Sequence, residues 1–218
     1  MERKTDVRRD SRPVGPKLFQ DEVEKAALEA RNGLLQFDLV VRLATEAIAA
    51  GQLRLRASTI QGLQRAAING IYTCAGNYRT GPVQIHGTTH QPPPHEEVPS
   101  LVEQMCDYVI DNWSRTAVHL AAYIMWRLNW IHPFAGGNGR TSRAASYLVM
   151  CSRAKLLFPG AKTIPDQIVE SRQPYYAALD AADLAWQASG RVDVSVMEEL
   201  LSRLLAAQLL SAHAAATT

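Results

Sequence analysis

A histidine, a glycine-rich bend and two arginines follow one another within the short segment 132–143. The ordinary pKa of a histidine lies near roughly 6.5, so His132 can accept a proton from a hydroxyl nucleophile at neutral pH. Arg140 and Arg143 are spaced to lie on one face of a helix, and planar guanidinium groups bind phosphate oxygens in a bidentate manner. A base beside two such cations indicates chemistry on a phosphate ester.

The bend between the histidine and the arginines is suited to hold an anion. Gly136, Gly137 and Gly139 lack side chains, so backbone N–H groups can approach a ligand closely there. Apolar residues then recur at helical spacing, which predicts a helix over residues 138–154 with the bend at its N-terminus. Free N–H groups and the helix dipole favour an anion at that end. A bend of this composition is often only a turn, but its conjunction with a base and two arginines favours a phosphate site.

The stretch resembles the signature of the Fic family, H-P-F-x-[D/E]-G-N-G-R-x-x-R. Residues 75–79 and 83–87 are similar to the flap region of that family, and the segment 98–130 is similar to its two core helices. Members of the family typically transfer a nucleotide monophosphate, most often AMP from ATP, to a hydroxyl side chain of a protein. The resemblance therefore implies a protein nucleotidyltransferase that uses ATP or another nucleotide donor. Its partner would be a target protein that offers a Ser, Thr or Tyr hydroxyl.

The resemblance also implies roles for individual residues. His132 would be the catalytic general base, and Phe134 would pack in the core and hold the loop. The nucleotide and phosphate groups would be bound by Gly137, Asn138, Gly139, Arg140 and Arg143. The flap would pair with the target backbone as an added strand. The residues of this target-binding flap are Val83, Gln84, Ile85, His86 and Gly87.

Residue 136 departs from the signature, because glycine stands where the family has an acid that helps to hold Mg²⁺. Proteins usually bind Mg²⁺ through one or two carboxylates together with substrate phosphates, so a glycine weakens such a site. The loss is worth several kcal/mol of transition-state stabilisation. Four interpretations stay open: a metal ligand from elsewhere, a metal-independent transfer, a different donor, or a degenerate domain that binds a nucleotide or protein without turnover. Mg²⁺ therefore stays an open question, and we assign no residue as a metal ligand.

Other candidate metal ligands have simpler interpretations. Glu96 and Glu97 are carboxylates that could approach the loop, but they also suit the first turn of the helix that follows. His86, His90 and His95 fall together near the flap, yet their spacing is irregular and no fourth ligand is evident. We interpret these three histidines as polar flap and loop residues.

A second departure concerns regulation. Many family members carry an inhibitory helix with the pattern [S/T]-x-x-x-E-[G/N], and the equivalent segment here is 27–33, with Ala27 and Arg31 at the two defining positions. Arg31 would repel Arg143, and Glu29 lies roughly 200° away around a helix, so we predict that Glu29 faces elsewhere. We expect no self-inhibition by an intramolecular glutamate. A separate inhibitory protein is then one candidate partner.

Length and composition fit one globular domain. The chain has 218 residues, of which 47% are hydrophobic and 20% charged, enough for one substantial core. A net charge of +2 does not favour a nucleic-acid partner. Three cysteines without a C-x-x-C pair fit a reducing compartment, and neither a secretory signal nor an apolar run of membrane-spanning length is evident. We expect a cytoplasmic protein, with no membrane partner, that is able to form a homo-oligomer.

The pattern of apolar residues predicts an all-α fold, a Fic-type helical bundle with a small β-hairpin flap. Extended pairing is expected at residues 83–87 and, beyond them, at residues 88–90. We predict a flexible N-terminal arm over residues 1–18, a single domain over 19–212 and a frayed tail over 213–218. The predicted helices lie near residues 20–50, 57–74, 96–113, 116–130, 138–154, 165–171, 174–188 and 193–212.

Overall fold

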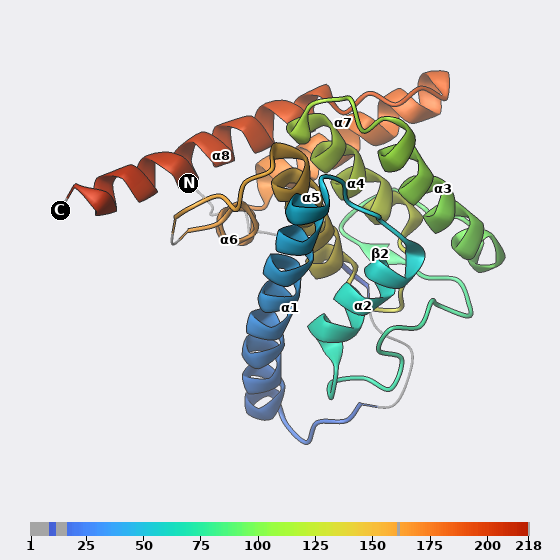
Figure 1. The fold of residues 1–218 in the computed structure, drawn as a ribbon. Helices are drawn as coiled ribbons and strands as arrows, with labels where there is room; N and C mark the ends of the chain where they lie inside the picture. The colour runs from blue at the N-terminus through green and yellow to red at the C-terminus, as the bar shows by residue number, and fades with distance from the viewer. Residues whose placement is uncertain (1–8, 12–16, 161, 218) are drawn as a thin grey trace, which may run out of the picture.

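The computed structural model describes residues 9–11, 17–160 and 162–217 (Figure 1). Helices make up most of these ranges and the two strands are two residues long each, so the predicted all-α class is confirmed. The α-helices are α1 (Glu22–Ala50), α2 (Ala57–Ile68), α3 (Val98–Asp111), α4 (Ala117–Ile131), α5 (Asn138–Ala154), α6 (Ile164–Glu170), α7 (Gln173–Ser189) and α8 (Ser195–Ala216). The other elements are the short strands β1 (Asp10–Ser11) and β2 (Ile85–His86) and the 3₁₀ turn η1 (His95–Glu97).

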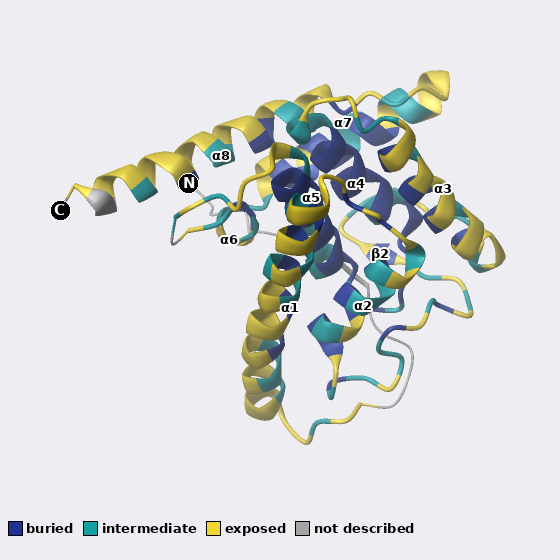
Figure 2. Cartoon of the chain, viewed as in Figure 1, coloured by how far each residue is buried: buried dark blue, intermediate teal, exposed yellow. Residues whose placement is uncertain are grey.

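Helix α4 forms the centre of the bundle. All of its residues from Leu120 to Leu128 are buried, and all of them except Arg127 are apolar or aromatic, as expected for a central helix. Helix α5 packs against α4, and the small residues Ala144, Ala145 and Ser146 let the two backbones approach. The Ser146 hydroxyl donates to the carbonyl of Ala121 at 2.9 Å. Figure 2 shows these two helices as the most buried part of the fold, with α1 and the end of α8 exposed outside them.

Helix α1 lies along α2 and α5 and is held by two buried amides. The Asn32 side chain donates to the carbonyl of Asn69 at 2.8 Å, and the Gln36 side chain donates to that of Leu63 at 2.8 Å. Because both amides bind backbone carbonyls of or just after α2, they fix the rotation of α1 about its axis. The face that carries them is turned to the core, and Arg31 is exposed.

The site lies where α4 ends and α5 begins. His132 closes α4 in the left-handed region, with φ 49°, and its N–H donates to the Leu128 carbonyl at 3.0 Å. Gly137 precedes α5 with φ 79°, a conformation that glycine adopts without strain. Helix α2 ends near the same loop, at Ile68 and not at the predicted residue 74, because Gly70 turns the chain with φ 74°.

The flap differs from the predicted hairpin. Strand β2 pairs antiparallel with β1, in the register Asp10 with His86 and Ser11 with Ile85, and residues 88–90 form no strand. Gly87 has φ 78°, and the His90 N–H donates to the Thr88 hydroxyl at 3.2 Å, so the chain turns locally after β2. The strand partner therefore comes from a segment more than seventy residues away in sequence.

The predicted arm and tail are described in part. Within the arm, residues 9–11 and 17–18 lie against the domain, and the Leu18 N–H donates to the Ile71 carbonyl at 3.0 Å. Residues 1–8 and 12–16 of the arm, and residue 218 of the tail, lie outside the described residues. Helix α8 continues to Ala216, past the predicted end at 212 (Figure 1). Within the described ranges, no helix has both the length and the hydropathy needed to cross a bilayer.

Candidate active site

His132 is a buried imidazole at the edge of a pocket, with 6% of the residue exposed. Its Nδ1 lies 3.3 Å from the carbonyl oxygen of Asn129. A carbonyl can only accept, so Nδ1 carries the proton and Nε2 keeps its lone pair. Burial lowers the pKa of His132 to about 3; the bond to Asn129 opposes this shift, and the nearby His90 and Arg79 add to it. The imidazole is therefore neutral at pH 7 and can accept a proton.

Arg79 holds the histidine backbone and the flap loop together. Its Nε donates to the His132 carbonyl at 2.9 Å, and its terminal nitrogens donate to the carbonyls of Gly81 at 3.1 Å and Pro93 at 2.5 Å. The backbone N–H of Arg79 also donates to the Pro133 carbonyl at 2.9 Å. Burial lowers the pKa of this guanidinium. Arg79 thus fixes the position of His132 from behind.

Asn138 locks the signature loop on itself. Its side-chain oxygen accepts from the Phe134 N–H at 3.0 Å, and its side-chain nitrogen donates to the Phe134 carbonyl at 2.7 Å. Phe134 is fully buried beneath the loop, as the sequence suggested. Asn138 also borders the pocket, together with Gly137 and Gly139, so the structure brings these three predicted residues together. The Asn138 amide itself serves the loop geometry.

Residue 136 faces the interior side of the loop. The Gly136 carbonyl accepts from the Gln64 amide at 3.0 Å, and the Gln64 oxygen accepts from the Gly76 N–H. Among the described residues, no three His, Cys, Asp or Glu side chains gather as metal ligands. Glu96 and Glu97 lie in η1, ahead of α3, and do not line the pocket. The residues present therefore do not fit a Mg²⁺ site built around a carboxylate at position 136.

Arg143 is a cation without a partner of opposite charge. It lies on α5 and lines the pocket, and its side chain forms no hydrogen bond or ion pair with any other described residue. Burial lowers its pKa, and Arg140 and Arg172 lower it further. A desolvated guanidinium in this state is stabilised by a bound anion, because phosphate oxygens satisfy both its charge and its N–H groups.

Arg140 and Glu29 form an ion pair, which corrects the prediction that Glu29 faces elsewhere. The Arg140 Nη2 nitrogen lies 3.3 Å from the Glu29 carboxylate, and Nη1 donates to the Ala67 carbonyl at 3.1 Å. Glu29 shares a helical stripe with Asn32 and Gln36, the residues that fix the rotation of α1. Those two amides decide which face of α1 is turned toward α5. The position of Arg31 in the inhibitory motif therefore did not predict the direction of Glu29.

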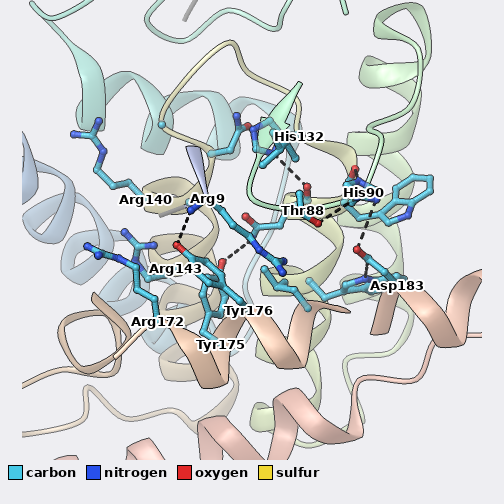
Figure 3. A pocket seen from close by; sticks show the side chains of 18 residues that line it. Arg9, Thr88, His90, His132, Arg140, Arg143, Arg172, Tyr175, Tyr176 and Asp183 are labelled. Carbon is cyan, nitrogen blue, oxygen red and sulfur yellow. Dashed lines mark hydrogen bonds and ion pairs between the residues drawn. The ribbon is translucent and has the colours of Figure 1, made fainter. Parts of the chain in front are cut away.

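The pocket is lined by more cations than the signature supplies. Arg172, just before α7, and Arg9, from the N-terminal segment, border it along with Arg140 and Arg143 (Figure 3). Asp183 is the acidic residue among the lining residues. The lining therefore carries a clear excess of positive charge and suits a polyanion.

Aromatic and polar side chains form the other end of the pocket. His90 Nε2 lies 2.8 Å from the Trp130 carbonyl, and its Nδ1 lies 3.6 Å from the Asp183 carboxylate. Asp183 also accepts from the Trp126 indole N–H at 2.8 Å. Burial raises the pKa of Asp183, against the opposing effect of that bond and of His90. This end, apolar with a few oriented polar groups, is typical of small-molecule sites.

The predicted flap contributes mainly through one residue. Ile85 is buried and lines the pocket, Val83 is half-buried, and Gln84, His86 and Gly87 are exposed. Sequence reasoning did not assign Arg9, His90, Arg172 or Asp183 to the site. His90 was set aside as a loop residue, and the other three lie far from the signature. No local pattern marked them.

Comparison with known proteins agrees with this geometry. Residues 54–150 match the model of the Fic/DOC family, a segment that contains the flap, α4 and most of α5. Among solved structures, a Fic domain containing signaling protein from Bacteroides thetaiotaomicron VPI-5482 has a TM-score of 0.66 at 20% identity, over 85% of this chain and 70% of that chain. A Fic family protein from Desulfovibrio desulfuricans G20 has a TM-score of 0.58 at 17% identity, over 91% and 70% of the two chains. The fold is that of Fic proteins.

Curated relatives point the same way. The protein adenylyltransferase fic-1 of Caenorhabditis elegans is 34% identical over 112 residues, which are 50% of this chain and 20% of the relative. The protein adenylyltransferase Fic of Drosophila willistoni is 27% identical over 124 residues, 56% of this chain and 24% of the relative. The match thus spans about a fifth to a quarter of these relatives. Over residues 54–150 the chain is therefore similar to proteins of the Fic/DOC family.

Proposed function

We propose that the chain transfers a nucleotide monophosphate, most simply AMP from ATP, to a hydroxyl side chain of a target protein. The observation that carries this proposal is the neutral, buried His132 in the same pocket as the unpartnered cation Arg143. The relatives named as protein adenylyltransferases support the same reaction class. The signature motif by itself does not give the burial of His132 or its place in one pocket with Arg143.

In the proposed reaction, the target hydroxyl gives its proton to Nε2 of His132 while its oxygen attacks the α-phosphorus of the nucleotide. The bond from that phosphorus to the next bridging oxygen breaks, and the products are the modified protein and pyrophosphate. Arg140, Arg143 and Arg172 would neutralise the phosphate oxygens and the departing pyrophosphate. The N-terminus of α5 would add its free N–H groups.

The lining also suits the non-phosphate part of a nucleotide. The end of the pocket with Trp126, Trp130 and His90 would hold the base and ribose. When bound, Mg²⁺ would add charge neutralisation on the phosphates, but the chain offers no carboxylate for it at position 136. Three free cysteines and the use of ATP fit a role in the cytoplasm.

A second candidate is a degenerate domain that binds a nucleotide or a protein without turnover. Gly136 favours this candidate, because the signature acid is missing. The retained His132, tautomerically set as a base, favours transfer.

Labelled transfer tests the two candidates. The chain is incubated with α-³²P-ATP and then with the other nucleoside triphosphates, with and without Mg²⁺, in the presence of a cell lysate. We expect label on protein that falls by about a hundredfold or more in His132→Ala, the range for a general base. Nucleotide binding that persists in both proteins, with no label from any donor, would instead establish the binding module.

A further inference from the structure

The edge of the flap that faces the pocket is already paired in this chain. Strand β1 lies antiparallel beside β2 and takes the place of an added strand. Arg9, the residue directly before β1, lines the same pocket as His132 (Figure 3), so β1 runs from the pocket to β2. The proposed function assigns this edge to the target polypeptide. The chain's own N-terminal segment therefore stands where a target strand would dock.

Arg9 anchors the segment within the pocket. Its guanidinium donates to the Asp180 carboxylate at 2.6 Å and lies 4.7 Å from the centroid of the Tyr176 ring. The Arg9 backbone N–H donates to the Tyr176 hydroxyl at 3.1 Å. The side chain of Arg9 is 16% exposed, so the ion pair is partly shielded from solvent. A charge-assisted bond, a cation–π contact and a backbone bond hold one residue.

The free space left beside the segment is small. The pocket retains a cavity of about 130 Å³. Sites for small-molecule ligands usually have volumes of roughly 300–1,000 Å³. With Arg9 in place, this cavity by itself is therefore tighter than a nucleotide and a target side chain together require, although Arg140 and Arg143 also line a second cavity of about 630 Å³.

We propose that residues 9–11 act as an intramolecular occupant of the flap edge, which a target protein must displace. This inference rests on the proposed function only for the identity of the displaced partner. Because the segment is tethered, its effective concentration at the flap is in the millimolar range. A target would therefore need either high affinity or a factor that draws the segment away.

Two substitutions in the full chain release the segment by different routes. Ser11→Pro restricts the backbone of β1 and removes an N–H group, which disfavours pairing with β2. Arg9→Ala removes the bond to Asp180 and the contact with Tyr176 but keeps the strand sequence. Arg42→Ala is the matched control, because Arg42 forms an exposed ion pair with Glu46 on α1, outside the site.

The probe is a fluorescent peptide that carries residues 5–16 of the chain, measured by fluorescence polarisation. We expect Ser11→Pro and Arg9→Ala to bind it about tenfold more tightly than the wild-type and Arg42→Ala chains, since the tethered competitor is weakened. A peptide carrying the same Ser→Pro change should not bind. Hydrogen exchange of residues 83–87 should be faster in both released variants than in wild type.

The inference is overturned if exchange at residues 83–87 and peptide binding are the same in wild type and both released variants. Neither readout uses a nucleotide, so a chain without transferase activity would still report on this contact. Conversely, slow exchange and weak peptide binding in wild type, relieved in the variants, would establish the occupant whatever the reaction. If transfer is found, the released variants should also modify a protein target faster.

Discussion

The signature loop and the flap border the same pocket, but they are held in very different ways. The loop is tied by side chains to α2, to itself and to the flap loop, through Gln64, Asn138 and Arg79. The flap strand β2 is paired over two residues only, and its partner comes from the N-terminal segment. The difference suggests a preassembled chemical centre next to an exchangeable docking edge, and each part can be tested separately.

The largest expected effect is on the loop. Asn138→Ala would leave the buried N–H and carbonyl of Phe134 without partners. We expect the free energy of unfolding to fall by about 2–4 kcal/mol, from the cost of two unsatisfied buried groups. Urea denaturation followed by circular dichroism measures this loss.

Asn112→Ala is the matched control for that change. The Asn112 amide binds the Tyr108 carbonyl at the half-buried end of α3. We expect it to cost less than about 1 kcal/mol, because water can replace the bond. If the free energy of unfolding falls equally in the two variants, the Asn138 bonds do not stabilise the loop more than an ordinary half-buried hydrogen bond does.

The acid sensitivity of the fold tests the burial of His132. Its folded pKa of about 3 lies below the ordinary value of 6.5, so protonation favours the unfolded chain. The stabilising effect of the neutral imidazole is complete above pH 6.5 and is lost as the pH falls toward 3. Between pH 7 and pH 5, the wild type should lose about 2 kcal/mol more than His132→Gln.

His213→Gln serves as the control for this pH dependence, because His213 is exposed on α8. Its stability should follow that of the wild type at every pH. If the stability of His132→Gln has the same pH dependence as that of the wild type, the imidazole is not desolvated in solution. The proposal that it is a neutral base at pH 7 would then be contradicted.

A smaller effect is expected at the edge of the phosphate site. Glu29→Gln would release Arg140 from its ion pair and let it bind phosphate oxygens more freely. Since the pair is partly exposed, we expect ATP to bind about two to five times more tightly. Isothermal titration calorimetry measures the change. Glu46→Gln, which breaks the exposed pair with Arg42 on the same helix, should leave ATP affinity unaltered.

The sequence predicted the helices and the loop because both have local signals. Apolar periodicity marked α4 and α5, and the contiguous signature placed His132 beside Arg143. Other lining residues, such as Arg9 and Asp183, reach the pocket only through tertiary packing. The rotation of α1 about its axis could not be predicted from the sequence either, because it depends on the bond from the Asn32 side chain to the carbonyl of Asn69, just after α2.

The pairing of the flap strand β2 with β1 could not be predicted from the sequence for a similar reason. A two-residue strand has almost no periodicity, and its partner lies in a segment whose charges suggested a solvated arm. Whether a short segment forms a strand depends mainly on its packing against neighbouring segments. The sequence could therefore indicate an extended flap at Ile85, and the structure was needed to identify its partner.

The most direct test of the account is ATP binding in the presence of EDTA, because the central claim is a preassembled anion site whose charge comes from arginines. The chain should carry Arg9→Ala, so that the N-terminal segment does not compete, and should be compared with the same chain after Arg143→Ala. We expect affinity in EDTA within about tenfold of that with Mg²⁺, and a loss of about ten- to a hundredfold on removing Arg143. Binding that vanishes in EDTA, or that does not respond to Arg143→Ala, would contradict the account.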